Sequence, residues 1–382
     1  MTMKGTLAWI IFGLAALTCL LWIGFGVRDD LREDDVFHNI IQERIDIAES
    51  SEDTLHIGAA GDWDRHQEVL HGIQLAADEI NATGGILGRT IVVDPQDDQG
   101  TVEGALTVAQ SFASRPEIGI VVGHTGLSLT AAVAQNYEFY GLLCITPNTA
   151  SNNSSKNRFS LIFENGISPQ QTGGAILKLA KEKQWKRLGL IYAKSTNAMH
   201  QARRFESMAN RHEINIPLSF AYEGRGSGVA EHMERWKREL DLDAMILTVD
   251  AADIIPLVSA CRVIGINCPF VIVSEPPASL TAKKTEGLNT LYFIDPLIDA
   301  AAHDALAPKT QARFNHGPTI DLLLGYDSLI VLKQAIIKAD SFVPARVAEA
   351  LRNAPIDESM SGTLRFDKHG SAIKRPPHFS EY

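Results

Sequence analysis

The chain has 382 residues, which is too long for one ordinary domain and long enough for two lobes with additional segments. Charged residues make up 21% and hydrophobic residues 45%, a balance that excludes a disordered or low-complexity chain. The net charge of −11 argues against a nucleic-acid binder, and four cysteines are too few for a disulfide scaffold of this size.

The first predicted element is an uncharged apolar run over residues 7–27. At about 1.5 Å per residue, a helix of this length reaches roughly 31 Å, enough to span the core of a bilayer. Trp9 and Trp22 lie towards its two ends, where interfacial aromatic residues occur. A cleaved secretory signal or a lipoprotein signal is the alternative, although residues 16–19 match a lipoprotein cleavage box only loosely. We predict a single-pass inner-membrane anchor over residues 1–28, with the rest of the chain on the periplasmic side.

An acidic juxtamembrane spacer is predicted over residues 29–54. Residues 28–53 carry ten acids and three arginines. Apolar side chains recur there at helical spacing, which indicates a short amphipathic helix within the spacer; they are Val36, Ile40, Ile41, Ile45 and Ala48. Two interpretations are open, a solvated tether and a docking helix for a partner protein.

From Leu55 onward, short apolar runs alternate with amphipathic stretches in β–α order, which predicts parallel sheets covered by helices on both faces. In the first half we expect strands over 55–60, 91–94, 118–122 and 142–146, and helices over 69–80, 102–114 and 129–140. The alternation then begins again, with helices over 172–184, 202–212, 229–240 and 254–264, and strands over 188–192, 216–222, 244–249 and 270–273. The last predicted elements are a strand over 291–294, helices over 322–339 and 345–352, and a strand over 362–366.

The doubled pattern predicts an α/β fold of two doubly wound parallel-sheet lobes joined by a hinge. We assign residues 55–166 and 295–342 to lobe 1, and residues 167–294 and 343–382 to lobe 2. The hinge crossovers are expected near residues 165–168, 292–296 and 340–344. Ligands bind outside the carboxyl ends of parallel strands, so the site is expected in the loops that follow the strands, with the two lobes facing each other across a cleft.

The signatures of common enzyme sites are absent from the sequence: it contains no GxSxG, HExxH, Walker lysine loop or CxxC. The twelve histidines show no metal-ligand spacing, and His66 and His71, five apart, miss the i,i+4 register. The acidic turn at residues 97–100 is interpreted as a helix start capped by Asp98 or Thr101. We therefore expect no enzymatic activity, no cofactor and no metal site. Cys261 and Cys268 could form a bridge or remain free thiols.

Several segments together carry a family resemblance. They are residues 72–89 (GIQLAADEINATGGILGR), 97–100 (DDQG), 121–128 (VVGHTGLS), 145–150 (ITPNTA), 326–327 (YD) and 364–370 (LRFDKHG). This collection resembles the type I periplasmic binding proteins, in particular the leucine/isoleucine/valine-binding group of ABC transporter substrate-binding proteins, over about residues 55–382. The resemblance implies a protein that captures an amino acid between two lobes, closes on it, and delivers it to membrane permease and ATPase subunits.

The resemblance also implies ligand-binding residues on both lobes. A bound amino acid is a zwitterion, and both of its charges need partners when buried. Ser128 and Thr149, with Asn148 and Ala150 beside it, would hold the carboxylate, and Glu275 would hold the ammonium group. The structural alternatives are a helix N-cap for Ser128, a turn hydroxyl for Thr149 and an exposed loop acid for Glu275.

Four further candidates lie on loops in which this chain departs from the family pattern. Trp63 and Arg65 belong to a first loop that is shorter and more charged than usual. Ser195 and Asp250 follow strands of lobe 2 where the family often has an aromatic residue. The order Thr149–Ala150 also reverses the family's Ala-Thr. These departures predict a weakly aromatic, more polar pocket and put branched aliphatic ligands in doubt.

We therefore expect an extracytoplasmic, non-catalytic protein that captures an amino acid or a similar small polar solute in an interlobe cleft for an ABC transporter. The alternative is a membrane-anchored sensor that passes a signal to a partner protein and has no transport role. Neither hypothesis includes a nucleic-acid partner.

Overall fold

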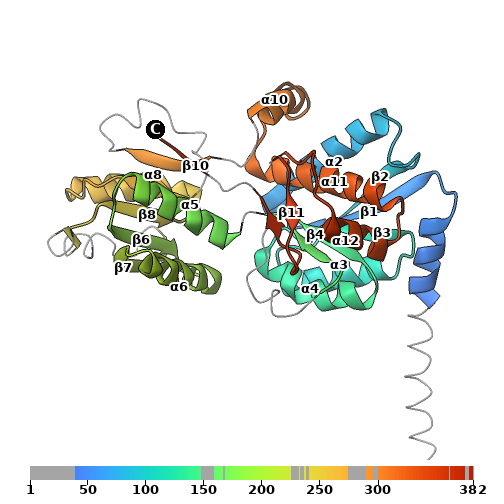
Figure 1. Ribbon diagram of the computed structural model, residues 1–382, viewed down its shortest axis with the longest axis horizontal. Helices are drawn as coiled ribbons and strands as arrows, with labels where there is room; N and C mark the ends of the chain where they lie inside the picture. The colour runs from blue at the N-terminus through green and yellow to red at the C-terminus, as the bar shows by residue number, and fades with distance from the viewer. Residues whose placement is uncertain are drawn as a thin grey trace, which may run out of the picture.

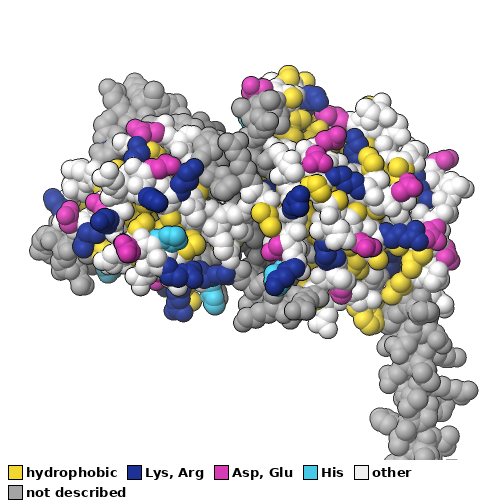
Figure 2. Space-filling model, in the orientation of Figure 1, with side chains coloured by type: hydrophobic (Ala, Val, Ile, Leu, Met, Phe, Trp, Pro, Cys, Tyr) yellow, Lys and Arg dark blue, Asp and Glu magenta, His cyan; other side chains and the backbone are white. Residues whose placement is uncertain are grey.

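The structure, a computed structural model, describes residues 39–147, 159–166, 168–224, 232, 236–237, 241–273, 290–295, 300–360, 362–374 and 378–381. Figure 1 shows two α/β lobes side by side, the first built around β1 to β5 and the second around β6 to β10. Figure 2 shows acidic and basic side chains interspersed over both lobes on the face that it presents.

The first lobe contains a five-stranded parallel sheet with the order β2-β1-β3-β4-β5. Its strands are β1 (Thr54–Gly61), β2 (Thr90–Asp97), β3 (Ile118–Gly123), β4 (Leu143–Thr146) and β5 (Ile162–Glu164), and its first helices are α2 (Trp63–Ala82), α3 (Val102–Ala113) and α4 (Leu127–Phe139). Ile120 and Val122 face a core shared with α2, whereas Val121 faces the core shared with α3 and α4. The near-continuous apolar strands of the sequence are therefore buried on both faces, as parallel sheets require.

The second lobe repeats this arrangement with a six-stranded sheet of order β13-β10-β9-β8-β6-β7. Its strands are β6 (Arg187–Ala193), β7 (Asn215–Tyr222), β8 (Ala244–Thr248), β9 (Phe270–Ile272), β10 (Leu291–Asp295) and β13 (His378–Glu381), and its helices include α5 (Pro169–Glu182), α6 (Thr196–Arg211) and α8 (Ala251–Val263). Only β13 pairs antiparallel in this described sheet. Leu190 and Ile191 again point into cores on opposite faces.

The later elements return to the first lobe: α10 (Ala300–Phe314), α11 (Ile320–Ala339), α12 (Pro344–Asn353), β11 (Arg365–Phe366) and β12 (Ala372–Ile373). Helix α11 packs backbone to backbone on α2, because a Cβ on Gly72 would overlap the carbonyl oxygen of Leu322, and one on Gly325 would overlap that of Val69. The two glycines are therefore required for this close approach.

The apolar face of α12 lies in the core of the first lobe, where Val347 and Leu351 pack with Phe366 of β11. Our division of the sequence placed residues 343–382 in lobe 2, but in the structure only β13 of this segment joins the second sheet. The third crossover accordingly lies between β12 and β13 and not near residues 340–344. Helical periodicity shows that α12 has an apolar face, but it does not show which lobe that face contacts.

A helix over residues 39–49 packs on the first lobe. The Arg44 side chain is 2% exposed, and its guanidinium donates to the carbonyl oxygens of Ile118 (2.8 Å), Tyr140 (2.7 Å), Ala113 (3.0 Å) and Arg115 (3.4 Å). Burial lowers the pKa of Arg44 to about 10. This part of the acidic segment is therefore docked on its own chain and is not a solvated tether.

Most predicted helices and strands of the body are confirmed within one to six residues at their ends. The strands β5, β12 and β13 were not predicted because they have only three, two and four residues. Helix α10 was not predicted because it has neither a strong apolar face nor a largely apolar sequence. The predicted helix over 229–240 lies largely outside the described residues. Among the described helices, none is long and apolar enough to cross a membrane, and the predicted span over 7–27 lies outside the described residues. Cys144, Cys261 and Cys268 are free thiols.

Candidate functional site

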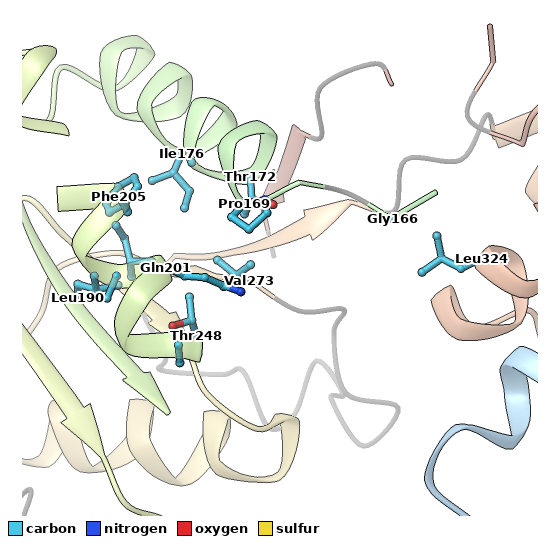
Figure 3. A pocket seen from close by; sticks show the side chains of 14 residues that line it. Gly166, Pro169, Thr172, Ile176, Leu190, Gln201, Phe205, Thr248, Val273 and Leu324 are labelled. Carbon is cyan, nitrogen blue, oxygen red and sulfur yellow. The ribbon is translucent and has the colours of Figure 1, made fainter. Parts of the chain in front are cut away.

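A cavity of about 300 Å³ lies at the carboxyl edge of the second sheet (Figure 3). Thr248 ends β8 and Val273 follows β9 directly, so both place side chains at the strand ends. Helices α5 and α6 form the adjacent walls, and Leu324 reaches towards the cavity from α11 of the first lobe. The cavity is therefore interlobe, at the position where open parallel sheets bind ligands.

The cavity wall is predominantly apolar. Its polar side chains are Thr172 on α5, Gln201 on α6 and Thr248 on β8. The apolar contributors include Pro169, Ile176, Leu190, Phe205, Ile246, Val273 and Leu324. A pocket of this composition favours a small ligand with an aliphatic part and a few hydrogen-bonding groups. The polar pocket predicted from the loops is not what the described residues form, because the helices α5 and α6 supply much of the wall.

The carboxyl edge of the first sheet presents two helix N-termini. Asp62, which follows β1, is the N-cap of α2, and Gly126 is the N-cap of α4; neither makes a side-chain capping hydrogen bond. The backbone N–H of Asp62 donates to the Thr125 hydroxyl oxygen over 3.1 Å, which ties the loop after β1 to the loop after β3. The N–H groups of the first turn of a helix have no intrahelical partner and favour anions. This edge can therefore accept a carboxylate.

A buried polar cluster around His124 lies in the loop that follows β3, at the same edge of the first sheet. His124 Nδ1 lies 2.6 Å from Asp98 Oδ2, and His124 Nε2 lies 2.9 Å from the Tyr137 hydroxyl, with all three side chains fully buried. Burial raises the pKa of Tyr137 well above its ordinary value, so the phenol stays protonated and is able to donate to His124 Nε2. The Thr146 hydroxyl donates to the His124 carbonyl over 3.0 Å. These hydrogen bonds hold the loop after β3 in place. Of the two residues predicted to cap α3, Thr101 is the N-cap, whereas the Asp98 side chain binds His124.

Two of the predicted site residues lie at the start of α2. The Trp63 ring packs so close to the chain at Gly61 that a Cβ there would overlap it, and the Trp63 Nε1–H is buried without a hydrogen-bond partner among the described residues. Arg65 is 78% exposed and lies 3.6 Å from Asp62 Oδ2. Trp63 therefore has a free donor at the edge of the first lobe, whereas Arg65 makes a surface ion pair.

The remaining predicted residues are distributed over the loops. Ser195 caps α6 and accepts from the Ala198 N–H over 3.2 Å, and Asp250 is the exposed N-cap of α8. Ser128 is the second residue of α4, so it is not the N-cap of that helix. The predicted contacts of four residues cannot be placed because they lie outside the described residues: Asn148, Thr149, Ala150 and Glu275. The sequence analysis did not predict three residues of the cavity wall, Thr172, Gln201 and Phe205. The signal that could have indicated Thr172 and Gln201 is a polar side chain next to the apolar face of a helix, α5 or α6.

A buried network lies where the chain crosses between the lobes. The Asp327 carboxylate on α11 accepts from Lys374 Nζ (3.1 Å), Asn165 Nδ2 (3.2 Å), the Ser359 hydroxyl (3.2 Å) and the Met360 N–H (2.6 Å). Asn165 begins the first crossover, after β5, and Lys374 precedes the third, before β13. One carboxylate on the first lobe therefore holds the ends of two crossovers.

The comparisons with known proteins agree with this geometry. The model of the periplasmic binding protein family matches residues 58–376. The chain belongs to this family. It is a family of binding proteins, and the chain is a binding protein rather than an enzyme.

Two curated relatives come from Pseudomonas aeruginosa. An amino acid binding protein is 26% identical over 337 residues, which cover 82% of this chain and 84% of the relative. A leucine-, isoleucine-, valine-, threonine- and alanine-binding protein is 25% identical over 321 residues, which cover 78% of this chain and 80% of the relative. The crystal structure of an ABC transporter substrate-binding protein from Desulfitobacterium hafniense in complex with Leu superimposes with a TM-score of 0.73 at 23% identity, covering 86% of this chain and 97% of that one. The two-lobed fold expected from the sequence is thus confirmed.

Proposed function

We propose that the chain is an extracytoplasmic substrate-binding protein of an ABC transporter, and that it captures an amino acid with a small aliphatic side chain. The observation that carries the proposal is the apolar cavity at the carboxyl edge of the second sheet, with Leu324 of the first lobe opposite it. The name of one Pseudomonas relative gives amino acid binding, and the name of the other includes leucine, isoleucine, valine and alanine among its ligands. This ligand class is narrower and less polar than the one predicted from the loops.

In this proposal the two lobes divide the ligand between them. The aliphatic side chain enters the cavity between α5 and α6, where its burial contributes about 25 cal/mol per Å² of apolar surface. The carboxylate binds the N-terminal N–H groups of α2 or α4, whose N-caps leave them free of side-chain caps. Glu275 remains the candidate for the ammonium group. The Thr248 hydroxyl and the Gln201 amide oxygen in the cavity wall would accept hydrogen bonds from the remaining N–H donors of the ammonium group. Hinge closure then brings Leu324 onto the ligand.

Calorimetry against all the amino acids tests the ligand class. We expect leucine, isoleucine or valine to bind, with arginine and glutamate giving no heat. Thr248→Val and Gln201→Leu each remove a polar group of the cavity wall and should weaken binding by about three- to tenfold, the effect of about 1 kcal/mol for one neutral hydrogen bond. The matched controls Thr107→Val and Gln110→Leu alter exposed residues of α3 and should leave the affinity unchanged. Preferred binding of a charged amino acid, or equal effects of the cavity and control variants, would contradict the proposal.

The proposed transport role is tested by identifying the proteins that bind this chain. Purification of the full chain from membranes should recover a permease and an ATPase if the protein delivers its ligand to a transporter. Recovery of a kinase or cyclase in their place would favour the sensor hypothesis. N-terminal sequencing of the same material tests the proposed anchor, because a retained anchor begins at the first residues and a cleaved signal does not.

A further inference from the structure

A histidine-rich cluster outside the cavity joins α2 to the connection between α10 and α11. Glu68 and His71 lie one turn apart on α2, and His316 lies in the connection that follows α10. Glu68 Oε1 is 3.2 Å from His71 Nδ1 and 3.3 Å from His316 Nε2, and the three atoms all lie within 4.8 Å of one another. All three side chains are partly exposed.

The spacing of these atoms matches the edges of a metal coordination shell. In a tetrahedral zinc site with metal–ligand bonds of about 2.1 Å, neighbouring ligand atoms lie about 3.4 Å apart. The two distances from Glu68 Oε1 are already close to this value. The remaining edge, between the two histidine nitrogens, can shorten by rotation of His316, whose side chain is 39% exposed.

The second hydrogen bond of His316 fixes which of its nitrogens is available. His316 Nδ1 lies 2.7 Å from the carbonyl oxygen of Gly317, an acceptor, so Nδ1 carries the proton and donates. In the neutral ring Nε2 then presents its lone pair to the lone pairs of Glu68 Oε1, so either a proton on Nε2 or a bound cation is needed between the two atoms. A histidine whose other N–H is held by a backbone carbonyl is the arrangement that metal-ligating histidines adopt.

The surroundings hold the other two ligands in place. The Phe314 ring stacks on His71 with the ring centroids 4.2 Å apart, and the Thr319 hydroxyl lies 3.5 Å from the second oxygen of Glu68. The nearby cations are already paired, since Lys309 Nζ lies 2.8 Å from Glu79 Oε1 and Arg313 pairs with Asp78. Among the described residues, the ion-pair partners of Glu68 are therefore the two histidines, and no lysine or arginine pairs with it.

We propose that Glu68, His71 and His316 form a site for a divalent transition metal, with zinc as the best fit. Two imidazoles and one carboxylate suit Zn²⁺, whereas Mg²⁺ and Ca²⁺ prefer oxygen ligands throughout. A solvent molecule completes the tetrahedron on the exposed side. The metal fastens the C-terminal end of α10 to α2, next to the position where α11 carries Leu324 to the cavity. No spacing motif indicated this site, because His316 lies 245 residues beyond His71 along the chain.

The test uses the full chain, purified without a histidine tag and freed of metal by dialysis against a chelator. Titration calorimetry with ZnCl₂ should show one Zn²⁺ per chain, and CoCl₂ should give the visible absorption of a tetrahedral Co²⁺ site. His316→Ala and Glu68→Gln should weaken zinc binding by at least about tenfold. His303→Ala, which removes another partly exposed histidine, on α10, should leave it unchanged.

Circular dichroism of each variant shows whether weaker zinc binding is caused by unfolding. His316→Ala should disturb the fold least, because His316 lies in a connection between helices. The proposal is overturned if the wild type binds no Zn²⁺, which would leave a Glu68–histidine ion-pair network only. It is equally overturned if His316→Ala and His303→Ala weaken binding alike, or if Mg²⁺ binds as tightly as Zn²⁺.

Discussion

The buried pair of Asp327 and Lys374 should respond very differently to the loss of either partner. The two side chains are 3% and 2% exposed, with 3.1 Å between Lys374 Nζ and Asp327 Oδ2. Asp327→Asn leaves the ammonium buried without a counter-charge, and we expect the free energy of unfolding to fall by about 3–5 kcal/mol. Lys374→Met leaves a carboxylate that still accepts from Asn165, Ser359 and Met360, so we expect a smaller loss of about 2 kcal/mol.

The double variant Asp327→Asn/Lys374→Met removes both charges together. The double variant should therefore lose less free energy of unfolding than the two single variants together, by about 1–3 kcal/mol. This difference is the coupling energy expected of residues in one network. Urea unfolding followed by circular dichroism gives the free energies by linear extrapolation. The control is Glu182→Gln, which breaks the pair with Lys178, four residues earlier on α5; this pair is 3.9 Å long with side chains 75% and 59% exposed. That control should cost no more than about 0.5 kcal/mol.

The reasoning would be refuted if the loss of free energy of unfolding in the double variant equalled the sum of the two single losses within about 0.5 kcal/mol. Such additivity would mean that the two charges do not interact. A loss for Lys374→Met that exceeds the loss for Asp327→Asn would refute the second part. It would show that the hydrogen bonds from Asn165, Ser359 and Met360 do not compensate the carboxylate.

Two further outcomes follow from buried polar groups. Arg44→Met removes four hydrogen bonds to backbone carbonyls and should lower the free energy of unfolding by about 2–4 kcal/mol and expose residues 39–49 to proteolysis, whereas Arg203→Met, at an exposed position of α6, should do neither. Burial raises the pKa of Cys261 to about 12 and of Cys268 to about 11, so in the folded protein iodoacetamide should alkylate both slowly at pH 8 and faster as the pH rises towards 10. Peptide mapping should show rapid labelling of both in urea, and equal rates in folded and unfolded protein would contradict the burial.

The two-lobed fold could be predicted because its signal is repeated. Apolar runs such as Ile118–Val122 are buried on both faces of the sheet, and the helices between them have one apolar face, so local patterns determine the β–α order. The lobe that α12 joins could not be predicted in this way. Its assignment depends on contacts between Val347, Leu351 and the β11 region, which no local period encodes.

The site could be predicted only by its location. Parallel strands place their carboxyl ends at one edge, so the loops after β8 and β9 were expected near the ligand, and Thr248 and Val273 do line the cavity. The side chains of the wall were not predictable, because Gln201 and Phe205 reach the cavity from the body of α6 and not from a strand end. Ser195 shows the converse: a hydroxyl in the expected loop is used to cap α6.

The helix over residues 39–49 is docked on the first lobe, which suggests which of the two lobes would move in the proposed closure. Arg44 binds its underside to carbonyls around α3 and α4, and Arg89 donates to the carbonyl of Ala48 at its C-terminal end over 3.1 Å. With the proposed anchor retained, only residues 28–38 separate the apolar run from the docked helix, a reach of at most about 40 Å. The first lobe then has a short connection to the membrane, while the second lobe is joined to the chain only through the crossovers near Asn165, after β10 and after Lys374. In the proposed function, closure on a ligand would therefore move the second lobe towards a first lobe that a retained anchor would restrain.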